Sequence, residues 1–177
     1  MNSAAFPTRF DSTLDLARLP WFEVRGGNRL VMTDDAVAEV GPIIDMHTHL
    51  AMGFFRKLRV DLHAETPTAA YYLPVTLPVD LDRYSNENFD AGTLFAMKAD
   101  VSVLGLTAQG MRTTHTAPNL LRDMAALGIV SSVVLPFDLP VGARNADQLL
   151  EVARRYPELV PFGSVHPMDR DADARLD

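Results

Sequence analysis

The most regular pattern of hydrophobic and polar positions lies in the last third of the chain, between Pro118 and Val165. Apolar residues recur at helical spacing through 120–127 and again through 149–156. An apolar run follows each of these segments, at 129–135 and at 159–165. The pattern predicts two helices of about ten residues, each leading into a buried strand.

Residues with strong positional preferences mark the ends of these elements. Pro118 suits the first turn of a helix, and Gly128 suits the position just after its end. Asn145 can cap the second helix, which Pro157 closes. The residues that we expect to share one face of that second helix are Leu149, Leu150, Ala153 and Tyr156.

An earlier strand opens at Ile43 and Ile44, directly after the turn residues Gly41 and Pro42. Strands that alternate with helices of this length are typical of right-handed parallel crossover units. The sequence therefore predicts an α/β fold with a mostly parallel sheet. Such a sheet must be covered on both faces or closed into a barrel, because its strands are apolar on both sides.

The rest of the chain is less regular. Residues 1–40 mix turn residues with short apolar pieces, and we interpret them as an N-terminal extension with one hairpin around Gly26-Gly27. Residues 51–112 form a long insertion after the first strand, in which Asp90 can cap a helix over 91–99. Insertions of this length often act as lids or binding loops.

Residues 169–177 have the pattern of a helix that is just beginning, without an apolar stripe or a cap. A sheet that ended with the preceding strand would have an unpaired edge, which favours aggregation. We therefore expect residues 41–177 to be the N-terminal portion of a larger fold.

Composition narrows the classes of function. The 177 residues are 47% apolar, carry a net charge of −7 and include no cysteine, which excludes disulfides and thiolate metal sites. The negative charge disfavours nucleic acid, and we interpret the basic cluster of Arg56, Lys57 and Arg59 as a solvated face. No apolar run is long enough for a membrane span. We expect a soluble, cytoplasmic protein that acts on a small molecule. The sequence is also compatible with a homo-oligomer.

Candidate chemistry is concentrated in the segment from Ile43 to Leu50, which contains His47 and His49. Residues two apart in a strand point to the same side and lie about 6.6 Å apart, so both imidazoles can reach one metal ion. Asp45 has the same parity and is placed to accept the free N–H of a liganding imidazole. The same spacing occurs by chance in solvated loops, so an incidental pair of histidines is the alternative.

Other polar side chains carry a weaker signal. His166, at the exit of the third strand, and Asp138, after the second strand, are candidates for supporting the ligands or lining the same pocket. A structural role is the alternative for both. We interpret His63 and His115, in the insertion and its flank, as surface residues.

The run from Ile43 to Leu50 resembles the Asp-x-His-x-His signature of the first strand in the amidohydrolase superfamily of metal-dependent hydrolases. Residues 120–167 are similar to the second and third barrel units of the amidohydrolase-related branch. The resemblance implies a (β/α)8 TIM barrel, of which this chain forms the first part, about three β/α units. It also implies that His47 and His49 are metal ligands, and that the remaining ligands and the proton acceptor lie beyond Asp177.

The activity that the resemblance implies is hydrolysis by a metal-activated water, which attacks a C–N or C–O bond of an amide, ester or lactone. Zinc is the expected divalent ion because imidazole suits it. A metal-dependent decarboxylase of the same fold is one alternative. The others are a catalytically incomplete fragment and an acidic interaction module in which residues 51–112 bind a partner.

Overall fold

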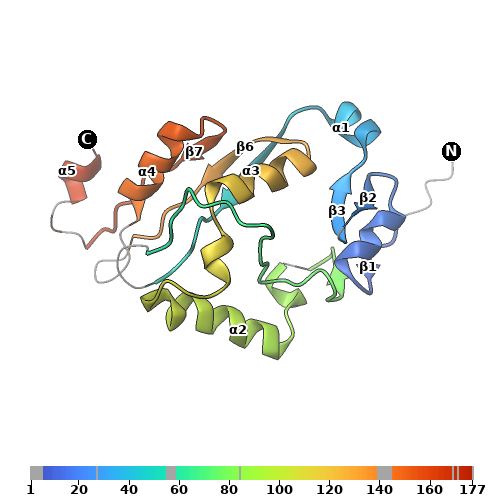
Figure 1. Cartoon of the computed structure of the whole chain (residues 1–177), viewed down its shortest axis with the longest axis horizontal. Coiled ribbons are helices and arrows are strands. Elements are labelled where there is room, and N and C mark those ends of the chain that lie inside the picture. The colour runs from blue at the N-terminus through green and yellow to red at the C-terminus, as the bar shows by residue number, and fades with distance from the viewer. Residues whose placement is uncertain are drawn as a thin grey trace.

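The computed structural model describes residues 6–26, 28–54, 59–83, 85–138, 145–168, 170 and 172–176. Within these ranges the strands form one three-stranded sheet and two two-stranded sheets. The predicted cluster of Arg56, Lys57 and Arg59 lies outside them except for Arg59, which is exposed. The two ends of the chain lie at opposite ends of the molecule (Figure 1).

The three-stranded sheet has the predicted parallel topology. Its strands are β4 (Ile43–Thr48), β6 (Ile129–Val134) and β7 (Leu159–Pro161), in the order β4-β6-β7. Helix α3 (Ala117–Ala126) leads into β6, and helix α4 (Ala146–Arg155) connects β6 to β7 (Figure 1).

Strand β7 is shorter than the sequence predicts. The expected strand over 159–165 ends at Pro161, although the Phe162 amide still donates to the Val134 carbonyl at 3.0 Å. Pro161 has no N–H with which to extend the hydrogen-bond ladder. The apolar run from 159 to 165 therefore overestimates the length of the strand.

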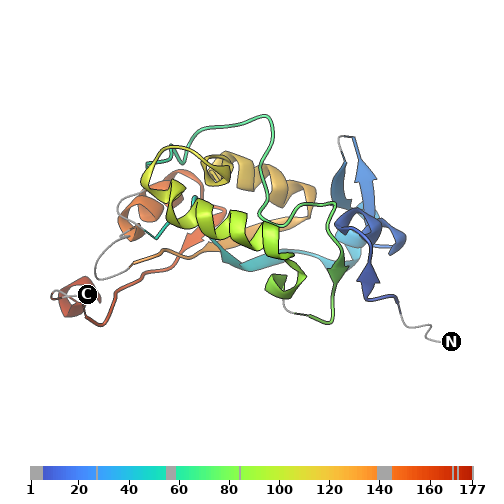
Figure 2. The ribbon, with the colours of Figure 1, turned by 90° about the horizontal axis from the view of Figure 1, so that it is seen from below.

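The main core lies between the sheet and its helices. Figure 2 shows α2, α3 and α4 on one side of the three strands. Helix α4 turns Leu149 and Val152 into this core, but Leu150 is 42% exposed, so the prediction that it shares a face with Leu149 is wrong. The buried residues of the core are Leu50, Ala51, Leu62, Ala117, Met124, Val134, Leu149, Val152 and Leu159.

The opposite face of the sheet exposes apolar side chains. Ile44 pairs with Ser131, and Val133 pairs with Val160, so these residues share one face, whereas Leu159 points to the helices. Ile44 is 56% exposed and Val160 is 42% exposed. A parallel sheet with one apolar face in water differs from the usual arrangement, in which both faces are covered.

The first turn of α4 is capped by a residue that the sequence pattern did not indicate. Asn145 occupies the cap position, but its side chain makes no capping hydrogen bond. The Asp138 carboxylate accepts instead from the backbone N–H groups of Asn145 and Ala146, at 2.8 and 3.3 Å. A carboxylate at a helix N-terminus also interacts favourably with the helix dipole.

The N-terminal region contains the predicted hairpin. Strands β2 (Phe22–Arg25) and β3 (Arg29–Met32) pair antiparallel around Gly26 and Asn28, while Gly27 lies outside the described residues. A 3-10 helix (Thr13–Arg18) precedes the hairpin and helix α1 (Asp34–Val40) follows it. The Thr33 hydroxyl caps α1 by accepting from the Ala36 amide at 3.3 Å.

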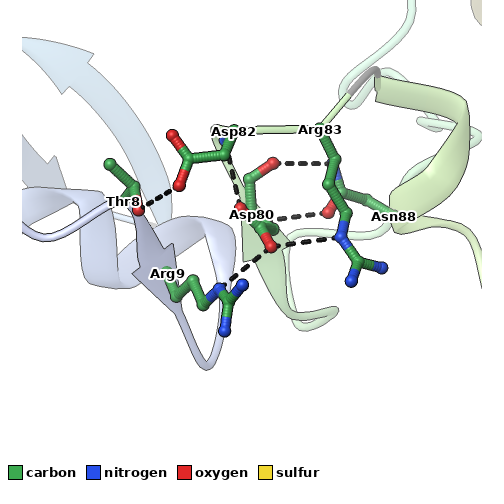
Figure 3. A network of polar contacts seen from close by, with 6 residues as sticks. All are labelled: Thr8, Arg9, Asp80, Asp82, Arg83 and Asn88. Carbon is green, nitrogen blue, oxygen red and sulfur yellow. Dashed lines mark hydrogen bonds and ion pairs between the residues drawn. The ribbon is translucent and has the colours of Figure 1, made fainter.

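The insertion after β4 pairs with the N-terminal extension, which the sequence pattern did not predict. Strand β1 (Arg9–Phe10) lies antiparallel to strand β5 (Val79–Asp80). Asp80 accepts from both Arg9 and Arg83, at 3.1 and 3.2 Å, and Thr8 donates to Asp82 at 2.7 Å (Figure 3). The two segments that flank the first parallel strand therefore contact each other.

Helix α2 (Ala91–Ser102) extends the predicted helix over 91–99 by one turn. Its cap is Asp90, as predicted, because the Asp90 carboxylate accepts from the Thr93 amide at 2.8 Å. The insertion also contains short 3-10 helices at Ser85–Asn88, Leu104–Leu106 and Met111–Thr114.

A buried polar network holds the end of the insertion. Asp100, 1% exposed on α2, accepts from the Tyr72 hydroxyl at 2.7 Å and from the Met111 amide at 2.6 Å. Arg112, also 1% exposed, donates to the Leu104 carbonyl at 2.6 Å. Burial raises the pKa of Tyr72, and its hydrogen bond to Asp100 acts in the same direction.

The last described element is α5 (Ala172–Leu176), where the sequence pattern predicts that a helix begins. Across the described ranges, none of the helices has the length and apolar character needed to cross a membrane.

Candidate metal centre

The two histidines of the first parallel strand converge on one point. His47 lies near the end of β4 and His49 follows it, and their Nε2 atoms are 3.2 Å apart. Two nitrogen ligands of one tetrahedral zinc ion, each at 2.0 to 2.1 Å, are separated by about 3.3 Å. The spacing of the two imidazoles therefore matches that of two ligands of a single ion.

The carbonyl of Leu135 orients the imidazole of His49. His49 Nδ1 lies 2.9 Å from this oxygen, which can only accept, so neutral His49 carries its proton on Nδ1 and leaves the Nε2 lone pair for a metal. The Leu135 amide in turn donates to the Thr48 carbonyl at 2.8 Å. The residue after β6 thus holds both the end of β4 and the ring that follows it.

His49 is partly shielded from water and His47 is exposed. The ring of Phe137 packs beside that of His49 with centroids 5.4 Å apart, and the ring of Phe54 lies 5.2 Å from that of Phe137. Burial lowers the pKa of His49, and repulsion from His47 adds to this effect. A lowered pKa favours the neutral imidazole, which is the form that binds a metal.

A bulge in β4 interrupts the strict alternation that the sequence analysis assumed. Asp45 pairs with Ser132 and Thr48 pairs with Val134, so three steps along β4 match two steps along β6. As a result Asp45 and Thr48 point to the same side, and the Thr48 hydroxyl donates to Asp45 Oδ2. Strict alternation along the strand would instead put Thr48 on the side opposite Asp45 and the two histidines.

Asp45 has different partners from the imidazole N–H that we expected. Its Oδ1 accepts the backbone N–H of His47 at 3.0 Å, and its Oδ2 accepts from Thr48 and lies 3.1 Å from Ser132 Oγ. Burial acts to raise the pKa of Asp45, but these hydrogen bonds outweigh it and the pKa lies below its ordinary value. Asp45 is thus a carboxylate that fixes the backbone of the strand.

The other two predicted pocket residues have local partners. His166 Nδ1 accepts the Met168 amide at 3.2 Å, and Asp138 caps α4. Within the part of the chain that the structure describes, no group of three or more histidine, aspartate or glutamate side chains could hold a metal ion. Among the described residues, the candidate ligands are therefore the pair His47 and His49.

The two histidines of the insertion and its flank are not simple surface residues. His115 Nε2 lies 2.7 Å from the Ala70 carbonyl, and its ring packs edge-on against Tyr72. His63 is stacked near Tyr156, with ring centroids 5.7 Å apart. Both imidazoles are half-buried, so the expected surface positions are wrong.

Ser132 is the residue at this site that the sequence analysis missed. It is 0% exposed, and its hydroxyl lies within hydrogen-bonding distance of Asp45 and Thr48. The signal was present in the sequence, because Ser131 and Ser132 interrupt an otherwise apolar buried strand. A buried hydroxyl requires a polar partner, and a neighbouring strand is the closest source of one.

The donor set fits a zinc-type ion: two imidazoles, one with its tautomer fixed, at the spacing of two ligands. Comparisons of the chain with protein-family models, with curated proteins and with solved structures find no match. The geometry of the site and the resemblance in the histidine motif are therefore the observations that bear on function.

Proposed function

We propose that this chain belongs to a metal-dependent hydrolase of the amidohydrolase type, in which His47 and His49 bind a divalent ion, zinc by preference. The observation that carries the proposal is the 3.2 Å separation of the two Nε2 atoms. With a metal bound, the ion would lower the pKa of a coordinated water toward about 7 and provide a nucleophile for an amide, ester or lactone.

The position of the pair in the sheet supports the proposal. His49 follows the end of β4, and Leu135, which orients it, follows the end of β6. Both lie at the carboxyl edge of parallel strands, where α/β folds position their catalytic groups. We place the remaining ligands and the proton acceptor outside the described residues.

The exposed face of the sheet supports a (β/α)8 barrel as the complete fold. Ile44, Val160 and Phe162 are apolar side chains that are 56%, 42% and 48% exposed. The interior of a closed barrel is packed with apolar side chains of this kind. On this proposal β4, β6 and β7 are the first three barrel strands, and residues 51–112 form a long insertion after the first of them.

Zinc content tests the ligand assignment. After incubation with zinc and extensive dialysis, we expect the wild-type chain to retain up to about one ion and the His47→Ala/His49→Ala variant to retain none. The matched control is His63→Gln, which removes an imidazole from the insertion and should retain zinc at the wild-type level. Equal zinc content in the wild type and the double variant would remove the ligand assignment.

Hydrolysis tests the reaction. We expect the zinc-loaded protein, including the segment that supplies the remaining ligands and the proton acceptor, to cleave members of a panel of aryl esters, anilides and lactones, to lose this activity with a chelator and to regain it with added zinc. The double variant should be inactive under both conditions. Activity that survives the chelator, or zinc binding without cleavage of any member of the panel, would count against a hydrolase.

A further inference from the structure

The bulge in β4 contains His47, the first histidine of the metal-binding pair, and ends just before His49. Between Asp45 and Thr48 the strand carries one residue more than its neighbour β6, and His47 falls within this irregular stretch. A bulge changes the direction in which the following side chains point and interrupts the local hydrogen-bond ladder. The convergence of His47 and His49 therefore depends on what holds this bulge in one conformation.

Asp45 closes the bulge from within the strand. Its Oδ1 accepts from the His47 backbone amide at 3.0 Å, and its Oδ2 accepts from the Thr48 hydroxyl. The carboxylate thus spans the bulge and fixes the backbone on which the first ligand is mounted. A carboxylate in this position needs further donors, because it is partly removed from water.

Ser132 contacts this bulge from the neighbouring strand, β6. Its Oγ lies 3.1 Å from Asp45 Oδ2 and 2.9 Å from Thr48 Oγ1. Its own backbone is fixed on the other side, since the Ser132 amide donates to the Glu158 carbonyl at 3.0 Å. Ser132 therefore connects the bulge of β4 to the segment that leads into β7.

The burial of Ser132 makes this contact difficult to replace. The residue is 0% exposed, so bulk water does not reach its hydroxyl. Without the hydroxyl, Asp45 and Thr48 lose a partner and the bulge can relax. The expected consequence is a wider range of orientations for His47, with less time spent near His49.

We propose that Ser132 is a positioning residue for the metal-binding pair, which acts by locking the Asp45–Thr48 bulge so that the two imidazoles meet. The inference rests on the proposed metal site and adds a residue from a second strand to it. Ser132 does not contact the ion. Side chains that orient metal ligands typically change metal affinity by 10- to 100-fold when they are removed, and we expect a loss of about tenfold here.

Zinc affinity of the folded protein tests this inference. We expect Ser132→Ala to bind zinc about tenfold more weakly than the wild type in competition with a chromophoric chelator. The matched control is Ser131→Ala, the neighbour of Ser132 on β6, because its hydroxyl donates to the Glu158 carbonyl just before β7 and its removal should leave zinc affinity unchanged. Circular dichroism at each titration point confirms that every variant is folded.

A second pair of variants covers the case in which Ser132→Ala fails to fold. Thr48→Val keeps the shape of the side chain but removes the hydroxyl that donates to Asp45, whereas Thr48→Ser keeps the hydroxyl. We expect Thr48→Val to bind zinc more weakly than the wild type and Thr48→Ser to bind it as tightly as the wild type. A purely structural role would lower stability in these variants without separating their zinc affinities.

The outcomes distinguish this inference from the proposed function. If His47→Ala/His49→Ala loses zinc while Ser132→Ala and Thr48→Val bind it within twofold of the wild type, the metal site stands and the positioning role falls. If the wild type binds no zinc, the proposed function falls. The positioning role is then decided by the nuclear Overhauser effect between the two imidazoles, which should be present in the metal-free wild type and lost in Ser132→Ala.

Discussion

The parallel sheet with its two helices and the segment inserted after β4 are stabilised in different ways. The sheet half has an apolar core with side chains from β6, β7, α3 and α4, to which Leu50, Ala51 and Leu62 of the segment after β4 also contribute. The insertion instead depends on buried polar contacts, among them those of Asp100, Arg112 and Asn119, each 1% exposed. The insertion begins two residues after His49, so the histidine pair lies at the junction between the two halves.

This difference predicts which substitutions each half tolerates. An aliphatic core loses stability in proportion to the volume that is removed. A buried polar network loses stability whenever one partner is removed and the others are left unsatisfied, even if the volume is unchanged. Stability measurements on matched variants of the two halves can therefore confirm or break the comparison.

The largest effect should come from the network of the insertion. Asp100→Ala leaves the Tyr72 hydroxyl and the Met111 amide without their acceptor, and we expect a loss of about 4 kcal/mol of unfolding free energy. Urea denaturation followed by circular dichroism measures it. The matched control, Asp147→Ala, changes an exposed aspartate in the first turn of α4 and should cost under about 0.5 kcal/mol. Equal small losses would show that the network contributes nothing.

The next effect should come from the core of the sheet half. Leu149 is 3% exposed and Leu150, the next residue on α4, is 42% exposed. We expect Leu149→Ala to lose about 3 kcal/mol and Leu150→Ala under about 1 kcal/mol, in the same denaturation experiment. A larger loss for Leu150 would mean that α4 packs through a different face.

The smallest expected effect is on the pH dependence of stability, and it comes from His115, which flanks the insertion. Burial lowers the pKa of His115, although its bond with the Ala70 carbonyl acts in the opposite direction. As the pH falls through about 6.5, the unfolded chain takes up a proton there that the folded chain does not, so stability decreases. We expect the wild type to be less stable at pH 5.5 than at pH 7.5.

The variant His115→Gln isolates this contribution. A glutamine at this position can donate to the Ala70 carbonyl but does not titrate. The loss of stability between pH 7.5 and pH 5.5 should therefore be smaller in His115→Gln than in the wild type. A pH dependence identical to that of the wild type would assign the effect to other groups, such as His49, whose pKa is also lowered.

The sequence predicts most of the sheet half because its elements follow simple periodicities. The helix ending before Gly128, the strand from Ile129 and the parallel order all agree with the structure. The errors arise where a contact between separate segments determines which side chain is buried or which residue caps a helix. Leu150 fits the helical period but faces water, and the cap of α4 comes from Asp138, seven residues before Asn145.

The insertion could be predicted much less well. Within the insertion, the sequence predicts only the helix after Asp90, because its cap and length are local features. The pairing of β1 with β5 joins residues about 70 positions apart, and the partners of Asp100 come from separate turns. Contacts of this kind leave no periodic signal in the sequence.

The candidate site shows the same division. The meeting of His47 and His49 agrees with the prediction, although β4 reaches it through a bulge and not through strict alternation. The roles of Leu135 and Ser132 were not foreseen, because both belong to β6 and its exit and depend on how that strand is aligned with β4. Strict alternation along β4 also gave the wrong side for Thr48, since a bulge cannot be recognised from alternation alone.

Imidazole nitrogen spectroscopy during a zinc titration tests directly whether His47 and His49 bind the same metal ion. The chain contains five histidines, and long-range 1H–15N correlation spectra resolve both nitrogens of each ring. We predict that zinc shifts the Nε2 signals of His47 and His49 together to positions typical of metal-bound imidazole, while His63, His115 and His166 stay unchanged. Signals of His47 and His49 that do not move at saturating zinc, or that move no more than those of the other three, would contradict the account.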